Sequence, residues 1–144
     1  MLCSKILVAY DGSDLGKRAL RKAIELAKTD SSIEIITIHA VELPPAVTAY
    51  AAYSYVDELN KAREYGENVI KEAKETLSAV PNRSRTLVIE GRPEQIILEQ
   101  SKELNCDMVI MGSRGLSALK ELFLGSVSHY VVQHSAVPVL VVKS

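Results

Sequence analysis

Three glycines and a serine in the last third of the chain have the types and spacing of an anion-binding turn. Two residues separate Gly112 from Gly115, nine separate Gly115 from Gly125, and Ser126 follows at the expected start of a helix. Glycine lets a backbone approach a phosphate closely and adopt positive φ. The first turn of a helix carries free amides and the positive end of the helix dipole. We therefore predict that the amides of Ser126 and Val127, with the Ser126 hydroxyl, bind phosphate oxygens.

Each of these residues also has a purely structural interpretation. Gly112 can form a tight turn after a strand, and Ser126 can be an N-cap that stabilises its helix by about 1 kcal/mol. Ser128, in the same turn, is a candidate for a further donor to phosphate. The combined spacing, directly after an apolar run that predicts a buried strand, favours a phosphate site over these separate explanations.

A second polar turn follows the first apolar run of the chain. Residues 6–10 predict a strand, and Asp11-Gly12-Ser13 ends it. Open parallel sheets bind ligands outside the carboxyl ends of their strands, at the point where the strand order reverses. In a sheet of order 3-2-1-4-5 this point lies between the first and fourth strands, so Asp11 and Gly112 are expected to face the same crevice.

The elements that position these turns alternate regularly. Continuous apolar runs predict strands at 6–10, 33–39, 86–89, 107–111 and 139–142. Helices are expected between them, starting at Ser13 or Asp14, covering about 57–80, starting at Pro93, and covering 126–134. This order predicts one α/β domain over residues 1–144, with a single open five-stranded parallel sheet and helices on both faces. For this sheet we assume two halves and the strand order 3-2-1-4-5.

The composition is that of an ordinary globular protein. Of the 144 residues, 47% are hydrophobic and 24% are charged, and the net charge is -1. This balance provides no field that would attract nucleic acid or a membrane surface, and no run approaches the ~18 apolar residues of a membrane span. Two cysteines, Cys3 and Cys106, are too few for a disulfide framework. We therefore expect a cytoplasmic protein without nucleic-acid or membrane partners.

The segment from Leu43 to Tyr55 interrupts the regular alternation. It contains two prolines and three tyrosines among several alanines. We interpret it as an irregular surface loop with a little apolar packing, because loops of this length usually run over the surface. The alternative is a lid over a ligand or a surface for a partner.

Taken together, the motifs resemble those of the ATP-binding universal stress proteins. The pattern Gly-x2-Gly-x9-Gly-Ser is similar to the nucleotide-binding signature of that family. Five further stretches extend the resemblance over nearly the whole chain: VAYDGS, TIHAV, GRPEQII, CDMVIMGSRG and VPVLVV. The resemblance implies a Rossmann-like fold of the adenine nucleotide alpha hydrolase type. It also implies a nucleotide-binding homodimer with a regulatory or stress-response role.

The same resemblance implies roles for individual residues. Asp11 and the backbone of Ala9 and Tyr10 are expected beside the nucleoside, and the main chain of Ala40 is expected to meet adenine. Gly112 and Gly115 are expected to border the ribose and the phosphates of ATP, ADP or AMP. The phosphate chain is expected to be held by Gly125, Ser126 and Val127, commonly with Mg²⁺ or Mn²⁺. Two chains are expected to pair through Val137–Val142, because an unpaired apolar edge strand is an aggregation risk.

Two other classes of function stay open at this point. A slow ATP hydrolase would use the same site, with Asp11 and a metal orienting water, although the chain has no Walker A motif and no clear general base. A dimeric interaction module would keep the fold with a vestigial glycine loop. We interpret His39, at the end of a strand, as packed and hydrogen-bonded, whereas Arg114 either reaches a phosphate or faces solvent.

Overall fold

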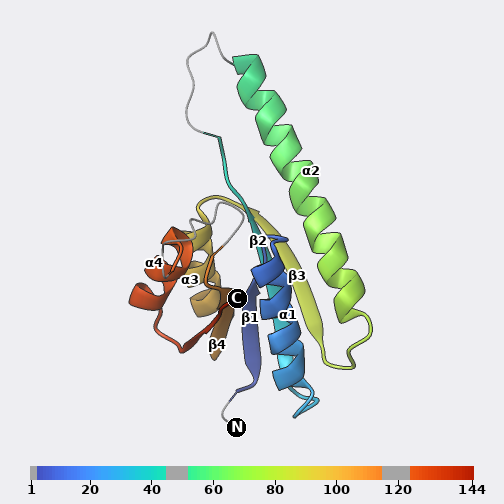
Figure 1. Ribbon diagram of the computed structural model, residues 1–144. Coiled ribbons are helices and arrows are strands. Elements are labelled where there is room, and N and C mark those ends of the chain that lie inside the picture. Colours follow the sequence, from blue (N-terminus) through green and yellow to red (C-terminus); the bar gives the residue numbers. More distant parts are fainter. Residues whose placement is uncertain (1–2, 45–51, 115–123) are drawn as a thin grey trace.

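The computed structural model describes residues 3–44, 52–114 and 124–144 (Figure 1). Its elements follow the chain in the order β1 (Lys5–Ala9), α1 (Asp14–Ala27), β2 (Glu34–Val41), α2 (Ala52–Leu77), β3 (Ser84–Glu90), α3 (Pro93–Glu103), β4 (Met108–Gly112), α4 (Ser126–His134) and β5 (Val139–Val142). Within the described ranges the strands form one parallel five-stranded sheet of order β3-β2-β1-β4-β5. The predicted fold class and strand order are confirmed.

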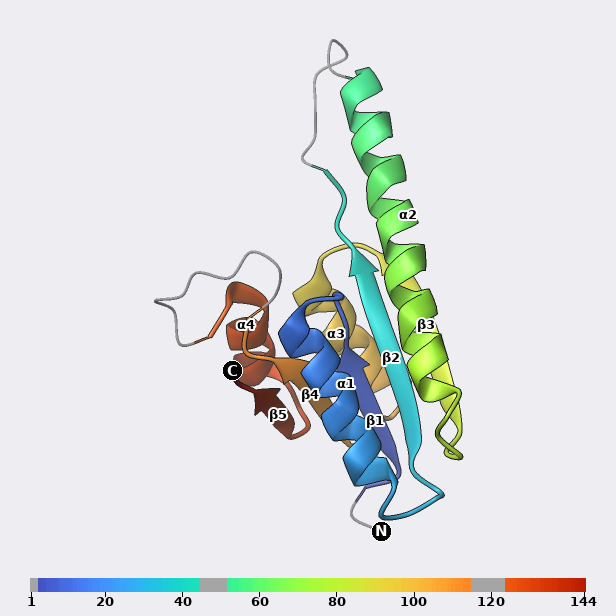
Figure 2. The same ribbon diagram turned by 45° about the vertical axis from the view of Figure 1, so that its right-hand side comes forward.

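Helices α1 and α2 cover one face of the sheet, and α3 and α4 cover the other (Figures 1 and 2). Successive strand residues point to opposite faces. Ile6 and Val8 of β1 therefore pack in one apolar cluster with α1 and α2, whereas Leu7 packs in the other with α3 and α4. Burial on both faces is the reason why the strands have continuous rather than alternating apolar runs.

Most element boundaries differ from the sequence prediction by a few residues, and two of these differences lie near the site. Helix α2 begins at Ala52, before the expected start near Asp57, and it extends past the end of β2 (Figure 2). The interpretation of 43–55 as an irregular loop is therefore wrong for 52–55, and 45–51 lie outside the described residues. Strand β2 continues to Val41, so Ala40 lies inside the strand rather than after it.

Cys106 has a packing role in the core. Its side chain is buried in the apolar cluster beneath α3 and α4. Burial raises the pKa of the thiol to about 11, so the thiol stays protonated near neutral pH. The residue therefore behaves as a small apolar side chain.

No helix in the described ranges is both long enough and apolar enough to cross a membrane.

Candidate functional site

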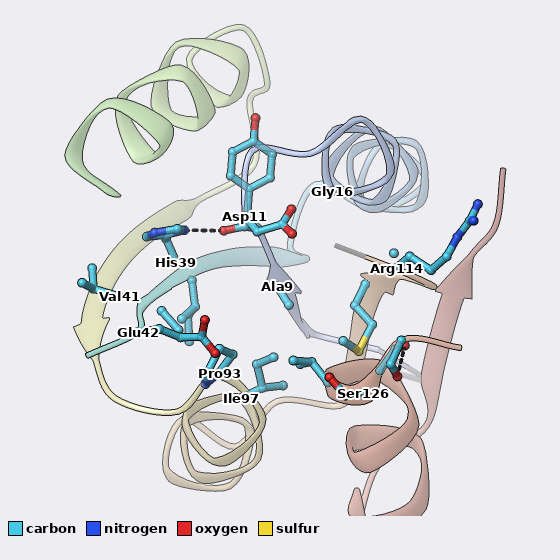
Figure 3. Close-up of a pocket in the computed structure, with 18 of the residues that line it drawn as sticks. Ala9, Asp11, Gly16, His39, Val41, Glu42, Pro93, Ile97, Arg114 and Ser126 are labelled. Atoms are coloured by element: carbon cyan, nitrogen blue, oxygen red, sulfur yellow. Dashed lines mark hydrogen bonds between the residues drawn. The ribbon is translucent and has the colours of Figure 1, made fainter. Parts of the chain in front are cut away.

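A cavity of about 720 Å³ opens at the carboxyl ends of the central strands (Figure 3). It lies where the strand order reverses, between β1 and β4. Its volume is in the range of small-molecule sites. Eight of the predicted site residues line it: Ala9, Tyr10, Asp11, Ala40, Gly112, Gly125, Ser126 and Val127. Gly115, the ninth, lies outside the described residues.

The amino-terminal end of α4 borders this cavity without a side-chain cap. Its N-cap is Gly125, so the alternative that Ser126 is the N-cap is wrong, and Ser126 is instead the first helical residue. The Gly125 amide donates to the Ser113 carbonyl at 2.7 Å, and the His129 amide donates to the Gly125 carbonyl at 2.9 Å. The three amides between them, from Ser126 to Ser128, have no backbone partner among the described residues. They lie at the positive end of the helix dipole and are available to an anion.

The Ser128 hydroxyl has a structural role, so that the possible donor of Ser128 to a ligand is its amide and not its side chain. Its buried hydroxyl donates to the carbonyls of Ser113, at 2.7 Å, and Gly125, at 3.1 Å. These bonds fix the entry of the chain into α4. Because the hydroxyl hydrogen is used in this way, the hypothesis that it donates to a phosphate is wrong for this arrangement.

The two described glycines of this region, Gly112 and Gly125, differ in the space around them. Neither Gly112 nor Gly125 has positive φ. A Cβ at Gly112 would lie 2.8 Å from the Leu15 Cβ and 3.1 Å from the Leu15 carbonyl carbon, so glycine here allows β4 to end against the first turn of α1. Among the described residues, a Cβ at Gly125 would meet nothing closer than the Ser113 carbonyl oxygen, at 3.4 Å. Gly112 is therefore required for packing, whereas Gly125 places no side chain over the helix end.

Asp11 is held in place by the turn that follows β1. Its Oδ1 accepts hydrogen bonds from the Ser13 amide at 3.0 Å and the Ser13 hydroxyl at 2.5 Å. Ser13 in turn caps α1 by accepting from the Gly16 amide at 3.1 Å. The amino-terminal end of α1 is thus closed by its own residues, in contrast to that of α4. The described residues provide no hydrogen-bond donor to Asp11 Oδ2, which leaves this oxygen to accept from a ligand.

His39 explains why the main chain of Ala40 is accessible. The last β1–β2 backbone bond runs from the Tyr10 amide to the Ile38 carbonyl at 2.8 Å. The next acceptor on the β1 side, the Tyr10 carbonyl, lies 2.9 Å from His39 Nδ1. Because a carbonyl only accepts, His39 Nδ1 carries the hydrogen. His39 therefore occupies the carbonyl that would otherwise pair with Ala40.

The alternation of a strand then decides which way Ala40 faces. Val41 accepts from the Gly91 amide on the β3 side, at 2.9 Å, so its neighbour Ala40 directs its N–H and C=O toward the β1 side. No described residue of β1 pairs with them. One donor and one acceptor of the main chain thus face the cavity. His39 itself is buried and hydrogen-bonded, as predicted.

Tyr65 of α2 is a site residue that the sequence did not reveal. Its hydroxyl donates to the Asp11 carbonyl at 2.7 Å, and its ring meets His39 edge-on with centroids 5.9 Å apart. The residue thereby ties the long helix to the turn after β1. Because the partners are more than fifty residues apart in the chain, no local pattern connects them.

Charged side chains are unevenly placed around the cavity. The guanidinium of Arg114 donates to Ser144 Oγ at 3.2 Å and extends away from Ser126 (Figure 3). The Glu42 carboxylate, by contrast, points into the cavity on the side of Pro93 (Figure 3). Glu42 was also missed, although a usable signal existed: it stands two positions after Ala40, and alternate strand residues share a face.

The fold and the cavity thus define an open α/β protein with a small-molecule site at the switch point of its sheet. Residues 3–143 match the model of the universal stress protein family. The chain is 37% identical to the universal stress protein YxiE of Bacillus subtilis, over 97% of this chain and 99% of that protein. It belongs to the universal stress protein family.

Solved structures agree with this assignment. The structure of MJ0577, a universal stress protein of Methanocaldococcus jannaschii, is similar with a TM-score of 0.89 and 28% identity, covering 100% of this chain and 98% of that chain. A universal stress protein solved in complex with cAMP is similar with a TM-score of 0.73 and 26% identity, covering 99% of this chain and 98% of the other.

Proposed function

We propose that this protein binds ATP in the cavity between β1 and β4, as a regulatory protein of the stress response. The observation that carries the proposal is the amino-terminal end of α4, whose first three amides border the cavity at the switch point without a backbone partner among the described residues. Such an end attracts the phosphates of a nucleotide. A relative solved with cAMP supports an adenine nucleotide as the ligand class.

The opposite side of the cavity suits a purine base. The N–H and C=O of Ala40, which no described residue of β1 pairs with, offer one donor and one acceptor, and the side chains of Ala9 and Ile97 provide apolar surface. Strands β2 and β4 are separated by β1, so the two sides lie about 10 Å apart. A nucleotide placed with its base at β2 and its phosphates at α4 would leave its ribose near Asp11.

A divalent cation would enter this site with the nucleotide. In the described ranges no three His, Cys, Asp or Glu side chains gather into a metal site. Mg²⁺ is usually held by one or two carboxylates together with substrate phosphates. Asp11 fits this role, because its bonds to Ser13 use only Oδ1 and Oδ2 has no donor among the described residues. The cation would neutralise charge on the phosphates.

The thermal unfolding temperature with different ligands tests the proposal. ATP at 100 times its dissociation constant adds about 2.7 kcal/mol to stability, which corresponds to a rise of roughly 5–10 °C for a chain of this size. Tripolyphosphate and adenosine, each supplied alone, are expected to give smaller rises. If tripolyphosphate alone raised the unfolding temperature as much as ATP, the site would bind anions without recognising the nucleoside. If ATP did not raise the unfolding temperature, the proposal would be refuted.

We further propose that two chains pair through Val137–Val142. Strand β5 forms one edge of the sheet, and Leu140 on this strand is exposed, as are Tyr130 and Val132 on α4. An apolar edge of this kind is protected when it pairs with a second copy. Sedimentation equilibrium is expected to give twice the chain mass for the wild type and the mass of one chain for Leu140→Glu. A wild type that sediments as single chains would contradict the pairing.

A further inference from the structure

Glu42 stands at the end of the cavity where the proposed function places the base. Strand β2 ends at Val41, and Glu42 follows it directly. Residues at even positions of β2, such as Ile36 and Ile38, pack toward α3 and α4. Glu42 continues this alternation, so its carboxylate lies over the start of α3, beside Pro93 and Ile97, with Ser126 on the other side of the cavity (Figure 3).

The Glu42 carboxylate is not used to hold the protein together. Within ranges 3–44, 52–114 and 124–144, none of the four ion pairs includes it. The side chain is exposed, and it lies near the positive end of the α3 dipole, which begins at Pro93. Pro93 has no N–H to offer the carboxylate. The carboxylate is therefore directed into the cavity without a backbone donor from the first residue of α3.

The Ala40 main chain cannot by itself choose between purine bases. Adenine presents an amine at position 6 beside the bare ring nitrogen N1, which is one donor and one acceptor. Hypoxanthine and guanine present an oxo group at position 6 beside N1–H, which is also one acceptor and one donor. A single N–H and C=O can pair with either edge after a small shift of the ring. To select one class of purine, the site therefore requires a further group that can only accept or only donate hydrogen bonds.

A carboxylate is such a group, because in its ionised form it only accepts hydrogen bonds. We propose that Glu42 selects 6-aminopurine nucleotides over 6-oxopurine nucleotides, by accepting a hydrogen bond from the exocyclic amine and repelling an oxo group. This inference rests on the proposed function and adds the specificity of that site. Hydrogen bonds to charged groups are stronger than neutral ones, so we expect a preference of about tenfold or more for ATP over ITP.

The dissociation constants of ATP and ITP test the proposal, because ITP replaces the 6-amino group of ATP by an oxo group. The wild type is expected to prefer ATP by about tenfold or more. In Glu42→Gln this ratio should approach one, since the amide can donate to the oxo group as well as accept from the amine. In Glu42→Ala the ratio should also fall, with a weaker affinity for ATP.

Glu94→Gln is the matched control. Glu94 lies in the first turn of α3, one residue after Pro93, and does not line the cavity. Its replacement removes the same charge from the same helix end, so it changes both affinities together and leaves the ratio as in the wild type.

Three results would overturn the assignment of Glu42. These are a wild-type ratio near one, a Glu42→Gln ratio equal to that of the wild type, and a Glu94→Gln ratio that falls as far as that of Glu42→Gln. If the wild type bound neither nucleotide at millimolar concentration, the proposed function would fail together with this inference. A ratio near one with tight binding of both nucleotides would refute the inference alone.

Discussion

Replacing Gly125 with aspartate is expected to weaken ATP binding by about 100-fold or more while the protein stays folded. Gly125 has φ -69° and ψ 167°, an extended conformation that any residue adopts. A Cβ there would make only ordinary contacts. Aspartate is a favoured N-cap residue, and its carboxylate would accept from the amides of the first turn. The variant would thus close the helix end with an internal anion, as Ser13 already closes the end of α1.

The size of this effect follows from two costs. A nucleotide would have to displace the cap, at about 1 kcal/mol, and would lose charge-assisted bonds worth about 1.5–3 kcal/mol. The dissociation constant of ATP and the thermal unfolding temperature check the prediction together. Gly125→Ala is the control, because it adds a Cβ without an acceptor and should keep binding. Undiminished binding by Gly125→Asp would show that the end of α4 does not hold the phosphates.

Replacing Gly12 with alanine is expected to be the most destabilising change near the site. Gly12 has φ +83°, and a Cβ there would lie 2.8 Å from Tyr65 Oη and 2.9 Å from Val69 Cγ2. The left-handed conformation costs about 1–2 kcal/mol, and overpacking adds about 1–3 kcal/mol. Together these give about 3 kcal/mol, a fall in unfolding temperature of roughly 10 °C. Thermal unfolding of the purified variant and of the wild type measures this fall in unfolding temperature.

The double variant Gly12→Ala with Tyr65→Phe separates the two costs. Phenylalanine removes the Oη that the new methyl group would strike, so part of the loss should be recovered relative to Gly12→Ala alone. Gly12→Asn, which tolerates left-handed backbone better, should recover a different part. If the unfolding temperature of Gly12→Ala lay within about 1 °C of that of the wild type, close packing of α2 against the turn after β1 would not exclude a side chain at position 12.

The general architecture could be predicted because its signals are local. Continuous apolar runs identified the strands, and alternation with helices predicted the parallel sheet. Its strand order was assumed, and the structure confirms it. The limits of α4, from Ser126 to His134, were also correct. The start of α2 was not: alanines and tyrosines at 52–55, close after Pro44 and Pro45, suggested a loop, whereas the structure continues the helix back to Ala52.

The finer features of the site depend on contacts between distant residues. The glycine at 112 was expected beside a ligand, and the structure adds a second reason for it, the proximity of Leu15, which lies almost a hundred residues earlier. The accessibility of Ala40 depends on His39 taking the Tyr10 carbonyl. Neither contact is predicted by the periodicity or the composition of the sequence. Of the two missed site residues, Tyr65 and Glu42, only Glu42 could have been predicted from the sequence, because alternate residues of β2 share a face.

Calorimetric titration of MgATP into nucleotide-stripped protein tests the central claim most directly. The account predicts saturable binding of about one nucleotide per chain, lost in Gly125→Asp and retained in Gly125→Ala. The absence of binding at millimolar ATP, or equal binding by the wild type and Gly125→Asp, would contradict a nucleotide site at the amino-terminal end of α4.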